Sequence, residues 1–289
     1  MSLGTSGPRT LRSRALGAAA LAATAALVLT GCGGGGDSEE GGGDGDSVRI
    51  GIKYDQPGLG YQDGSEYTGF DVDVAKYVAN ELGYGEDQIE WVQAPSANRE
   101  NMLQNNQVDM IFATYSITDT RKESVDFAGP YFVAGQDLLV TADNEDITGP
   151  EDLEGKNLCS VQGSTSAQTI KDDYAQGTNL VEQTGYADCL GALEAGNVDA
   201  VTTDDIILAG LASTDANRGK FKVVGNTFTE ERYGVGLPKG SDQCAAIGEA
   251  INKMIDEGDW EKAVTDNTEG ADYQFNADLN PPTAADGCA

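Results

Sequence analysis

The chain has 289 residues, with 18 Lys and Arg against 48 Asp and Glu, which leaves a formal net charge of −30. Such a balance argues against nucleic acid as a partner and against a basic membrane-binding face, and it is typical of a highly soluble exported protein. The sequence contains no histidine, which excludes Ser-His-Asp triads and imidazole chemistry, and without closely spaced cysteine pairs we predict no metal site and no cofactor.

The first 31 residues have the organisation of an export signal. Three arginines and no acidic residue precede an uncharged run rich in Ala and Leu, from Ala15 to Gly31. The run is too short and too rich in Ala for a transmembrane span, so we predict a signal peptide that is removed. It ends Leu29-Thr30-Gly31-Cys32, which resembles a bacterial lipobox and implies that Cys32 is lipidated. An ordinary signal peptide followed by a free Cys is the alternative.

Residues 32–47 are predicted to form a flexible tether. After Cys32 they comprise eight Gly, five acidic residues and two Ser, a composition that cannot bury a core. A random coil of this length spans about 20 Å. That is enough to hold a folded domain clear of a membrane surface.

The first folded unit alternates strands and helices. The loops Tyr54–Gly60 and Ala113–Thr118 follow two of its predicted strands. The order βαβαβ predicts a parallel sheet with helices on both faces, and these loops would meet at a ligand site at the carboxyl ends of the strands. Apolar runs and helical spacing predict these elements, in chain order, at Val48–Tyr54, Asp71–Leu82, Ile89–Gln93, Ala97–Gln104 and Val108–Ala113.

A second unit of the same kind follows the apolar strand Asp137–Thr141. The chain crosses between the units twice, near Asp137–Asp143 and near Gly225–Tyr233, which predicts a hinge with a ligand cleft between two lobes. A helical region, Cys244–Asn267, follows the second crossing. The other predicted elements of this unit are strands at Asn157–Val161, Leu180–Gln183, Asp199–Thr202, Phe221–Val224 and Tyr233–Leu237, and helices from Gly163 through Tyr174, at Tyr186–Ala195 and from Asp204.

The stretch from Val108 to Phe132 contains a candidate anion site. A hydroxyl-rich turn, Thr114–Thr118, follows the strand, and Asp119 can cap a short helix that carries Arg121. Hydroxyls, free backbone N–H groups and one guanidinium within about one helical turn suit a carboxylate that is bound bidentately. A capped helix with a surface arginine is the alternative, because short motifs of this kind are common.

Four cysteines remain if Cys32 is lipidated. In an oxidising compartment they are expected to pair, and three pairings are formally possible. Their order along the chain favours Cys159–Cys189 and Cys244–Cys288. Closing a loop of about 30 residues stabilises a small lobe by about 3–4 kcal/mol in the chain-entropy model.

Three segments carry a wider resemblance. They are Gly69–Ala75 (G-F-D-V-D-V-A), Ser116–Arg121 (S-I-T-D-T-R) and Val125–Tyr131 (V-D-F-A-G-P-Y). In order and spacing they resemble the family 3 solute-binding proteins of ABC importers for polar amino acids, whose fold is shared by ionotropic glutamate receptor ligand cores. The likeness covers about Val48–Gly270, and the glutamate-binding lipoproteins of actinobacteria are a similar subgroup.

The resemblance implies a two-lobe α/β fold of the periplasmic-binding-protein type. Each lobe would be a mainly parallel sheet flanked by helices, and a two-strand hinge would join them. The first lobe would comprise residues 48–138 and 229–289, and the second lobe residues 139–228.

The family's contacts to the ligand backbone have counterparts here. Arg121 and Ser116 would hold the α-carboxylate, and a carbonyl at Thr114 would accept from the α-ammonium. The chemistry agrees, because Arg offers a planar fork of donors.

The second lobe would add further contacts. The family uses a turn such as Gly163-Ser164-Thr165 at a helix start, where free N–H groups suit a carboxylate. A capped helix without a ligand is the alternative. Asp204, just past a strand, would pair the α-ammonium. The adjacent Asp205 is the alternative for this role, although it is rather expected to be a helix cap that faces water.

Two cations are candidates for reading the side chain of the ligand. In aspartate- and glutamate-binding members, basic residues at the positions of Lys53 and Arg99 meet the distal carboxylate, with a serine like Ser96 beside the arginine. Without the resemblance, solvated side chains would be the preferred interpretation of both.

The resemblance implies capture of an acidic L-amino acid, glutamate first and aspartate next. The protein would act as a monomer, anchored by lipid at Cys32 on the outer face of the cell membrane. It would deliver its ligand to an ABC permease and its ATPase. Binding of glutamine or another polar amino acid, and sensing for a membrane partner, are the alternatives. An enzyme is not expected, although the fold also hosts a few dehydratases.

Overall fold

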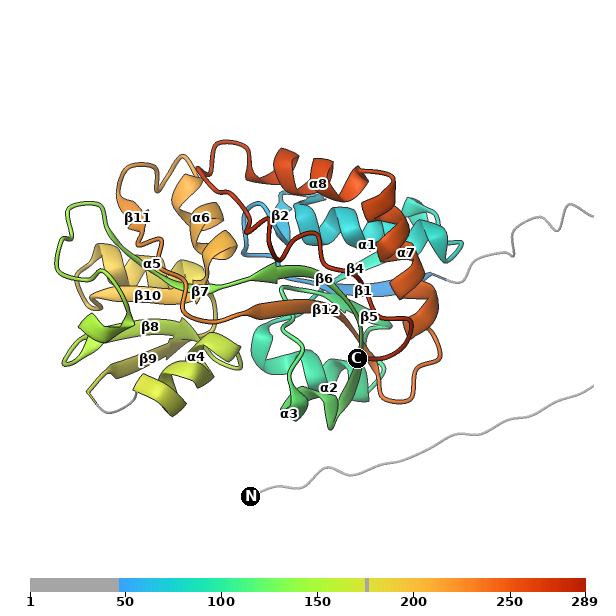
Figure 1. Cartoon of the computed structure of the whole chain (residues 1–289), viewed down its shortest axis with the longest axis horizontal. Helices are drawn as coiled ribbons and strands as arrows, with labels where there is room; N and C mark the ends of the chain where they lie inside the picture. Colours follow the sequence, from blue (N-terminus) through green and yellow to red (C-terminus); the bar gives the residue numbers. More distant parts are fainter. Residues whose placement is uncertain (1–46, 175–176) are drawn as a thin grey trace, which may run out of the picture. The chain divides into compact units, whose positions relative to one another are not determined.

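The computed structural model describes residues 47–174 and 177–289. The predicted signal peptide, the lipid site at Cys32 and the tether up to residue 46 lie outside the described residues. Within the described ranges, no helix is long and apolar enough to cross a membrane. These ranges form two five-stranded sheets, each flanked by helices, together with a small hairpin (Figure 1). The predicted two-lobe α/β class is confirmed.

The first sheet has the strand order β4-β1-β5-β12-β6. Its first three strands in that order are parallel, as the βαβαβ prediction requires. Phe70, Val74 and Val78 recur every four residues on the first helix and form a buried face that packs against β1 and β5. The elements are β1 (Val48–Ile52), α1 (Phe70–Glu81), β4 (Ile89–Gln93), α2 (Arg99–Gln104), β5 (Met110–Phe112), β6 (Val125–Ala134) and β12 (Glu231–Pro238).

The second sheet has the order β11-β7-β10-β8-β9. Here β8, β9 and β10 are parallel, and β7 runs antiparallel to both of its neighbours, β10 and β11. The elements are β7 (Gln136–Thr141), β8 (Asn157–Val161), α4 (Thr165–Thr169), β9 (Asn179–Gln183), α5 (Tyr186–Glu194), β10 (Ala200–Asp204), α6 (Asp205–Ser213) and β11 (Phe221–Val223).

The two crossings explain the mixed strand directions. Strand β6 runs into β7 across Gly135, and the return leads from β11 to β12 (Figure 1). In each sheet one crossing strand, β12 or β7, opposes the other four. The first crossing lies earlier than predicted, because Asp137 and Leu138 already pair in the second sheet. The long strand β6 was not among the predicted strands, although its residues Val125–Tyr131 belong to the family resemblance.

Several shorter elements complete the described chain. The helix expected from Gly163 to Tyr174 is α4 followed by a π-helical turn, Ile170–Tyr174. The helix expected from Ala97 is a 3-10 turn that leads into α2. The remaining elements are β2 (Tyr61–Asp63), β3 (Glu66–Thr68), α3 (Asp119–Lys122), α7 (Cys244–Asp256), α8 (Asp259–Thr268) and the 3-10 turns Glu86–Gln88, Ser96–Asn98 and Pro150–Leu153.

The C-terminal segment covers the free edge of β6. The Asn280 side chain bonds to both the N–H and the carbonyl of Val133 (2.9 and 2.7 Å). Nearer the C-terminus, Ala285 N–H donates to Gly129 O at 3.1 Å. The edge strand therefore has partners for backbone groups that would otherwise be open to pairing with another chain.

Two disulfides join the cysteine pairs that the chain order favours. Cys159 on β8 bonds to Cys189 on α5, with their Cα atoms 5.6 Å apart. Cys244 at the start of α7 bonds to Cys288 near the C-terminus, with a Cα separation of 5.0 Å. Each bridge therefore links elements packed around one sheet and leaves the crossings free.

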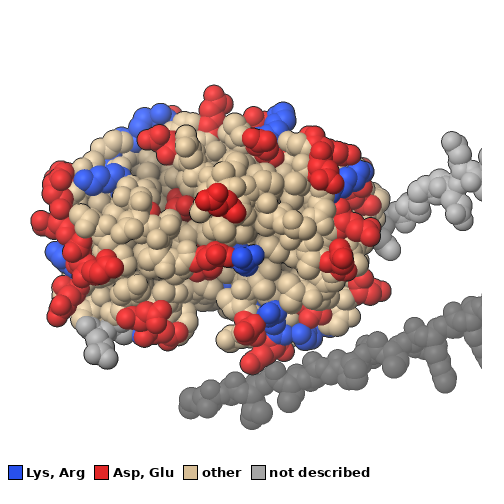
Figure 2. Space-filling model, viewed as in Figure 1, with Lys and Arg blue, Asp and Glu red and all other residues tan. Residues whose placement is uncertain are grey.

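Acidic side chains dominate the face shown in Figure 2, with fewer Lys and Arg between them. At physiological ionic strength the Debye length is about 8 Å. The surface charge therefore does not prevent a buried group of cations from attracting an anion.

Candidate ligand-binding site

A small cavity of about 10 Å³ lies where the two lobes meet. This volume holds about one water molecule, so the lobes are in contact around it. Six of the nine predicted ligand-binding residues line the cavity, together with four residues that the sequence analysis did not select. The predicted ones are Ser96, Arg99, Thr114, Ser164, Thr165 and Asp204, and the additional ones are Ser166, Tyr186, Thr203 and Ile207.

Asp71 holds the loop that follows β5. Thr114 in this loop has φ = +46°, a conformation that costs a β-branched residue free energy. The buried Asp71 carboxylate accepts from Thr114 N–H at 2.9 Å and from the Tyr131 hydroxyl at 2.7 Å. Burial raises the pKa of Asp71 to about 6. Asp71 was not among the predicted site residues. The signal that could have identified it is an acid among the apolar residues of the α1 helix.

Arg99 is buried without an acidic partner. Its side chain is 2% exposed, and it donates from Nη1 to the Ala113 carbonyl at 2.8 Å and more weakly to that of Thr114 at 3.4 Å. Its Nε has no hydrogen-bond partner. Among the described residues no acid lies within ion-pair distance of Arg99. Its remaining donors therefore suit an incoming anion.

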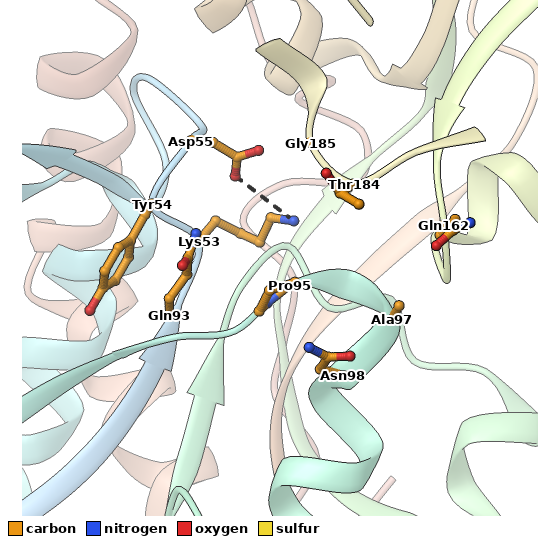
Figure 3. Close-up of a pocket in the computed structure, with 10 residues that line it drawn as sticks. All are labelled: Lys53, Tyr54, Asp55, Gln93, Pro95, Ala97, Asn98, Gln162, Thr184 and Gly185. Atoms are coloured by element: carbon orange, nitrogen blue, oxygen red, sulfur yellow. Dashed lines mark ion pairs between the residues drawn. The ribbon is translucent and has the colours of Figure 1, made fainter. Parts of the chain in front are cut away.

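Lys53 lines a second, larger pocket of about 390 Å³. Its Nζ donates to Ser96 Oγ at 3.2 Å and lies 3.9 Å from an Asp55 oxygen. Figure 3 shows the side chain extended toward Asp55, with Thr184 and Gly185 of the second lobe nearby. Burial lowers the pKa of Lys53 to about 8.

Arg121 links the two lobes. Its guanidinium donates to the carbonyls of Ser116 at 2.7 Å and of Gly163, on the second lobe, at 2.9 Å, and its Nε lies 3.2 Å from Glu100. Burial and the nearby Arg99 charge lower its pKa to about 10.

Two predictions for the candidate anion site were wrong. Arg121 is buried, so the surface-arginine alternative does not hold. The cap of α3 is Thr118 and not Asp119, because the Thr118 hydroxyl accepts from Arg121 N–H at 3.2 Å. Asp119 lies inside the helix as its first residue, and its carboxylate pairs with Lys122.

The turn before α4 meets the first lobe closely. The Thr165 hydroxyl lies 3.3 Å from that of Ser116. Gly163 has φ = +75°, and a Cβ there would lie 2.7 Å from the Cα of Ala97, so only glycine allows this approach. The Ser164 hydroxyl caps α4, accepting from Ala167 N–H and donating to the Val161 carbonyl. The Ser164 N–H also donates to the Val161 carbonyl, at 3.2 Å, so both donors of Ser164 are used within its own turn.

Asp204 is the buried acid of the cavity. Its oxygens accept from the hydroxyls of Tyr233 and Ser166, at 2.5 and 3.4 Å. No Lys or Arg of the described chain lies within ion-pair distance of it. Burial, together with the charge of Glu231, raises the pKa of Asp204 well above its usual value. A bound ammonium would supply the missing counter-charge.

Asp205 is the first residue of α6 and not its cap, contrary to the prediction. It is partly buried, and its carboxylate accepts from the N–H groups of Ile206 and of Gly135 at the first crossing (2.8 and 3.3 Å). Burial raises its pKa to about 6. The residue therefore ties the start of α6 to the crossing.

The sequence analysis did not select two polar residues deep in the second lobe. The Tyr186 hydroxyl lies 2.6 Å from the hydroxyl of Thr203, and the Tyr186 ring lies 5.9 Å from Lys53 Nζ. Thr203 belongs to the polar end of β10, a V-T-T-D sequence that ends an otherwise apolar strand. That change of polarity is the signal that could have identified it.

Two α/β lobes joined by two crossings, with a charged cavity between them, define a two-lobed binding protein. Residues 48–267 match the bacterial extracellular solute-binding proteins, family 3. The chain belongs to this family, as the sequence resemblance predicted.

Within this family, the chain is similar to binding proteins that are named for particular amino acids. The chain is 44% identical over 279 residues to the glutamate-binding protein GluB of Corynebacterium efficiens, across 90% of this chain and 94% of that one. It is 36% identical over 223 residues to the glutamine-binding protein GlnH of Bacillus subtilis, across 76% and 80%. Among solved structures, an ancestral arginine-binding protein bound to glutamine aligns with a TM-score of 0.71 and 32% identity, covering 77% of this chain and 97% of the other.

Proposed function

We propose that this protein binds an acidic L-amino acid outside the cell and passes it to an ABC importer. Glutamate is the preferred ligand and aspartate the next. The observation that carries the proposal is the unpaired charge of the site. Within the described residues, Arg99 is buried with an unpartnered Nε and Asp204 is buried with no cation at ion-pair distance, although both line the same cavity. A molecule with an ammonium and more than one carboxylate would neutralise both.

The ligand backbone would lie between the lobes. Arg121 and Ser116 would take the α-carboxylate, with the backbone N–H of Thr165 at the start of α4. Asp204 and the carbonyl of Thr114 would take the α-ammonium. In support, Ser116 in the loop after β5 and Arg121 on α3 both contact the turn that begins α4.

Lys53 and Arg99 would bind the side-chain carboxylate of the ligand, with Ser96 beside them. Lys53 already donates to Ser96 Oγ, and Ser96 and Arg99 line the same cavity. Two cations favour a carboxylate over an amide, because an amide would leave both of them under-paired. The similarity to GluB supports this choice, and the similarity to GlnH keeps glutamine as the alternative.

Binding without chemical change is the mode that the site supports. Titratable groups in the cavity suit recognition of charge, and a chain without histidine lacks the commonest proton-transfer residue. Delivery of the ligand to an ABC permease and its ATPase agrees with the family. The alternative is that the ligand-bound protein signals to a membrane partner.

We further propose that the protein works as a monomer held at the outer face of the cell membrane by lipid on Cys32. Stable anchoring needs two acyl chains, since one alone binds only reversibly. Cys32→Ala should shift the protein out of the membrane fraction. Unchanged acylation and fractionation of that variant would contradict the anchor.

A panel of the proteinogenic amino acids, measured by melting temperature and then by calorimetry, tests the ligand. Glutamate should raise the melting temperature most, and the recovered ligand should be chemically unchanged. Tighter binding of glutamine or of a basic amino acid would contradict the assignment of Lys53 and Arg99. Turnover of a bound compound would contradict the binding function itself.

A further inference from the structure

Tyr115 lies beneath the two buried arginines of the first lobe. It stands between Thr114 and Ser116 in the loop after β5, and its side chain is fully buried. The guanidinium carbons of Arg99 and Arg121 lie 4.1 and 5.0 Å from the centroid of its ring. A single aromatic ring therefore contacts both of the guanidinium groups assigned to carboxylates.

The sheet holds this ring in place without help from a ligand. Phe127 on β6 meets it edge-on, with ring centroids 4.8 Å apart and an interplanar angle of 71°. Gly236 on β12 leaves room for it, since a Cβ there would lie 2.6 Å from a ring carbon. The Tyr115 carbonyl also accepts from Gly234 N–H at 3.0 Å. The ring is thus a fixed part of the first lobe.

The two guanidinium groups need a compensating partner that does not compete with the ligand. They are buried and repel each other, and burial together with Arg99 lowers the pKa of Arg121. Within the described residues Arg99 has no acidic partner, and Arg121 has only Glu100. The negative face of an aromatic ring attracts cations and leaves their N–H donors free, and this attraction is stronger away from water.

We infer that Tyr115 is a positioning residue for the proposed amino acid site. Its ring holds Arg99 and Arg121 charged and oriented before the ligand arrives, so that both can bind carboxylates. The inference rests on the proposed function, and it adds a specific requirement for an aromatic face at this position. It also predicts that the hydroxyl of Tyr115, which makes no hydrogen bond to the described part of the chain, contributes little to affinity.

Calorimetry on two variants tests the requirement. Tyr115→Phe should bind glutamate within about threefold of the unmutated protein, whereas Tyr115→Leu should lose about 10-fold to 30-fold. The loss should be smaller for glutamine, whose side chain does not need Arg99. Phe221→Leu removes a buried ring in the second sheet that does not line the cavity, and it serves as the matched control. Equal affinities of the Leu and Phe variants would overturn the inference.

A graded measurement keeps the test valid if Tyr115→Leu folds poorly. Mono-, tri- and pentafluorinated phenylalanine at position 115 preserve the shape of the ring while they withdraw negative charge from its face. Glutamate affinity should fall step by step along the series at a nearly constant melting temperature. A flat series in a protein that binds glutamate would overturn the role of Tyr115 alone. If the unmutated protein binds no amino acid, the proposed function fails, and this inference fails with it.

Discussion

The two lobes bring opposite charges to the cavity. The first lobe contributes Arg99, whereas the second contributes Asp204 among mostly hydroxyl-bearing side chains. Lys53 and Arg121 of the first lobe do not line the cavity, although Lys53 bonds to its lining residue Ser96. The pKa of Lys53 and that of Arg121 are lowered, and the pKa of Asp204 is raised. All three shifts disfavour the charged form, because burial is the largest cause of each. Among the described residues, Arg99 of the first lobe and Asp204 of the second have no oppositely charged side chain within ion-pair distance.

This difference teaches which part of recognition each lobe performs. The cations of the first lobe are held by a fixed ring and by a loop that Asp71 anchors, so they are arranged in advance for carboxylates. In the proposed function, the acid of the second lobe would meet the ligand ammonium only when the lobes are together. Carboxylate recognition should therefore belong to the first lobe, and ammonium recognition and closure to the second.

Removal of Arg121 should have the largest effect. Arg121→Ala should weaken binding of every α-amino acid by about 2–5 kcal/mol, or about 30-fold to several thousandfold, because the variant leaves the α-carboxylate without its partner. Calorimetry with glutamate and glutamine measures this. The exposed Arg232, which pairs with Glu230, provides the control Arg232→Ala, which should bind normally. A loss below threefold in Arg121→Ala would contradict its role.

Replacement of Arg99 should remove the preference between ligands. Arg99→Met should lower glutamate affinity by about 2–3 kcal/mol, or about 30-fold to 150-fold, and glutamine affinity much less. Competition calorimetry with the two ligands gives the ratio directly. Equal losses for both would show that Arg99 acts on the shared backbone of the ligand and not on its side chain.

Replacement of Asp204 should lower the affinity for amino acids without lowering the stability of the unliganded protein. Asp204→Asn keeps a group that can accept from Tyr233 but removes the charge, so affinity for all amino acids should fall by about 1.5–3 kcal/mol. A carboxyl group whose pKa is raised by folding destabilises the folded protein as the pH rises from its unfolded pKa toward its folded pKa. The melting temperature of the unliganded variant at neutral pH should therefore equal or exceed that of the unmutated protein. A lower value would show that Asp204 is a structural residue.

A pH series should give the smallest effect. Because the pKa of Lys53 is about 8 and a bound carboxylate would raise it, glutamate binding should take up a proton as the pH approaches and passes 8. Affinity should be greatest below that pH and decline above it by at most about tenfold per pH unit. In Lys53→Met this part of the slope should disappear, whereas slopes due to other groups should remain. Identical slopes in the two proteins would remove Lys53 from the side-chain site.

Much of the fold could be predicted from local pattern. The strands Ile89–Gln93 and Asn157–Val161 have the predicted bounds, because a short apolar run between turns leaves few alternatives. The disulfide pairs agree with chain order. The reversed strands β7 and β12 could not be predicted in this way, since strand direction depends on which neighbour a crossing segment pairs with.

By itself, the sequence determined the class of the protein and a set of charged candidates, because motifs and apolar spacing are local properties of a chain. Only the tertiary structure decided which residues contact those charged side chains and hold the loop beside them. Asp71 reaches Thr114 across 43 positions of the chain, and Tyr115 lies against Arg99 because β5, β6 and β12 pack side by side. Such contacts depend on sheet order and close packing, which bring together residues that no local pattern connects.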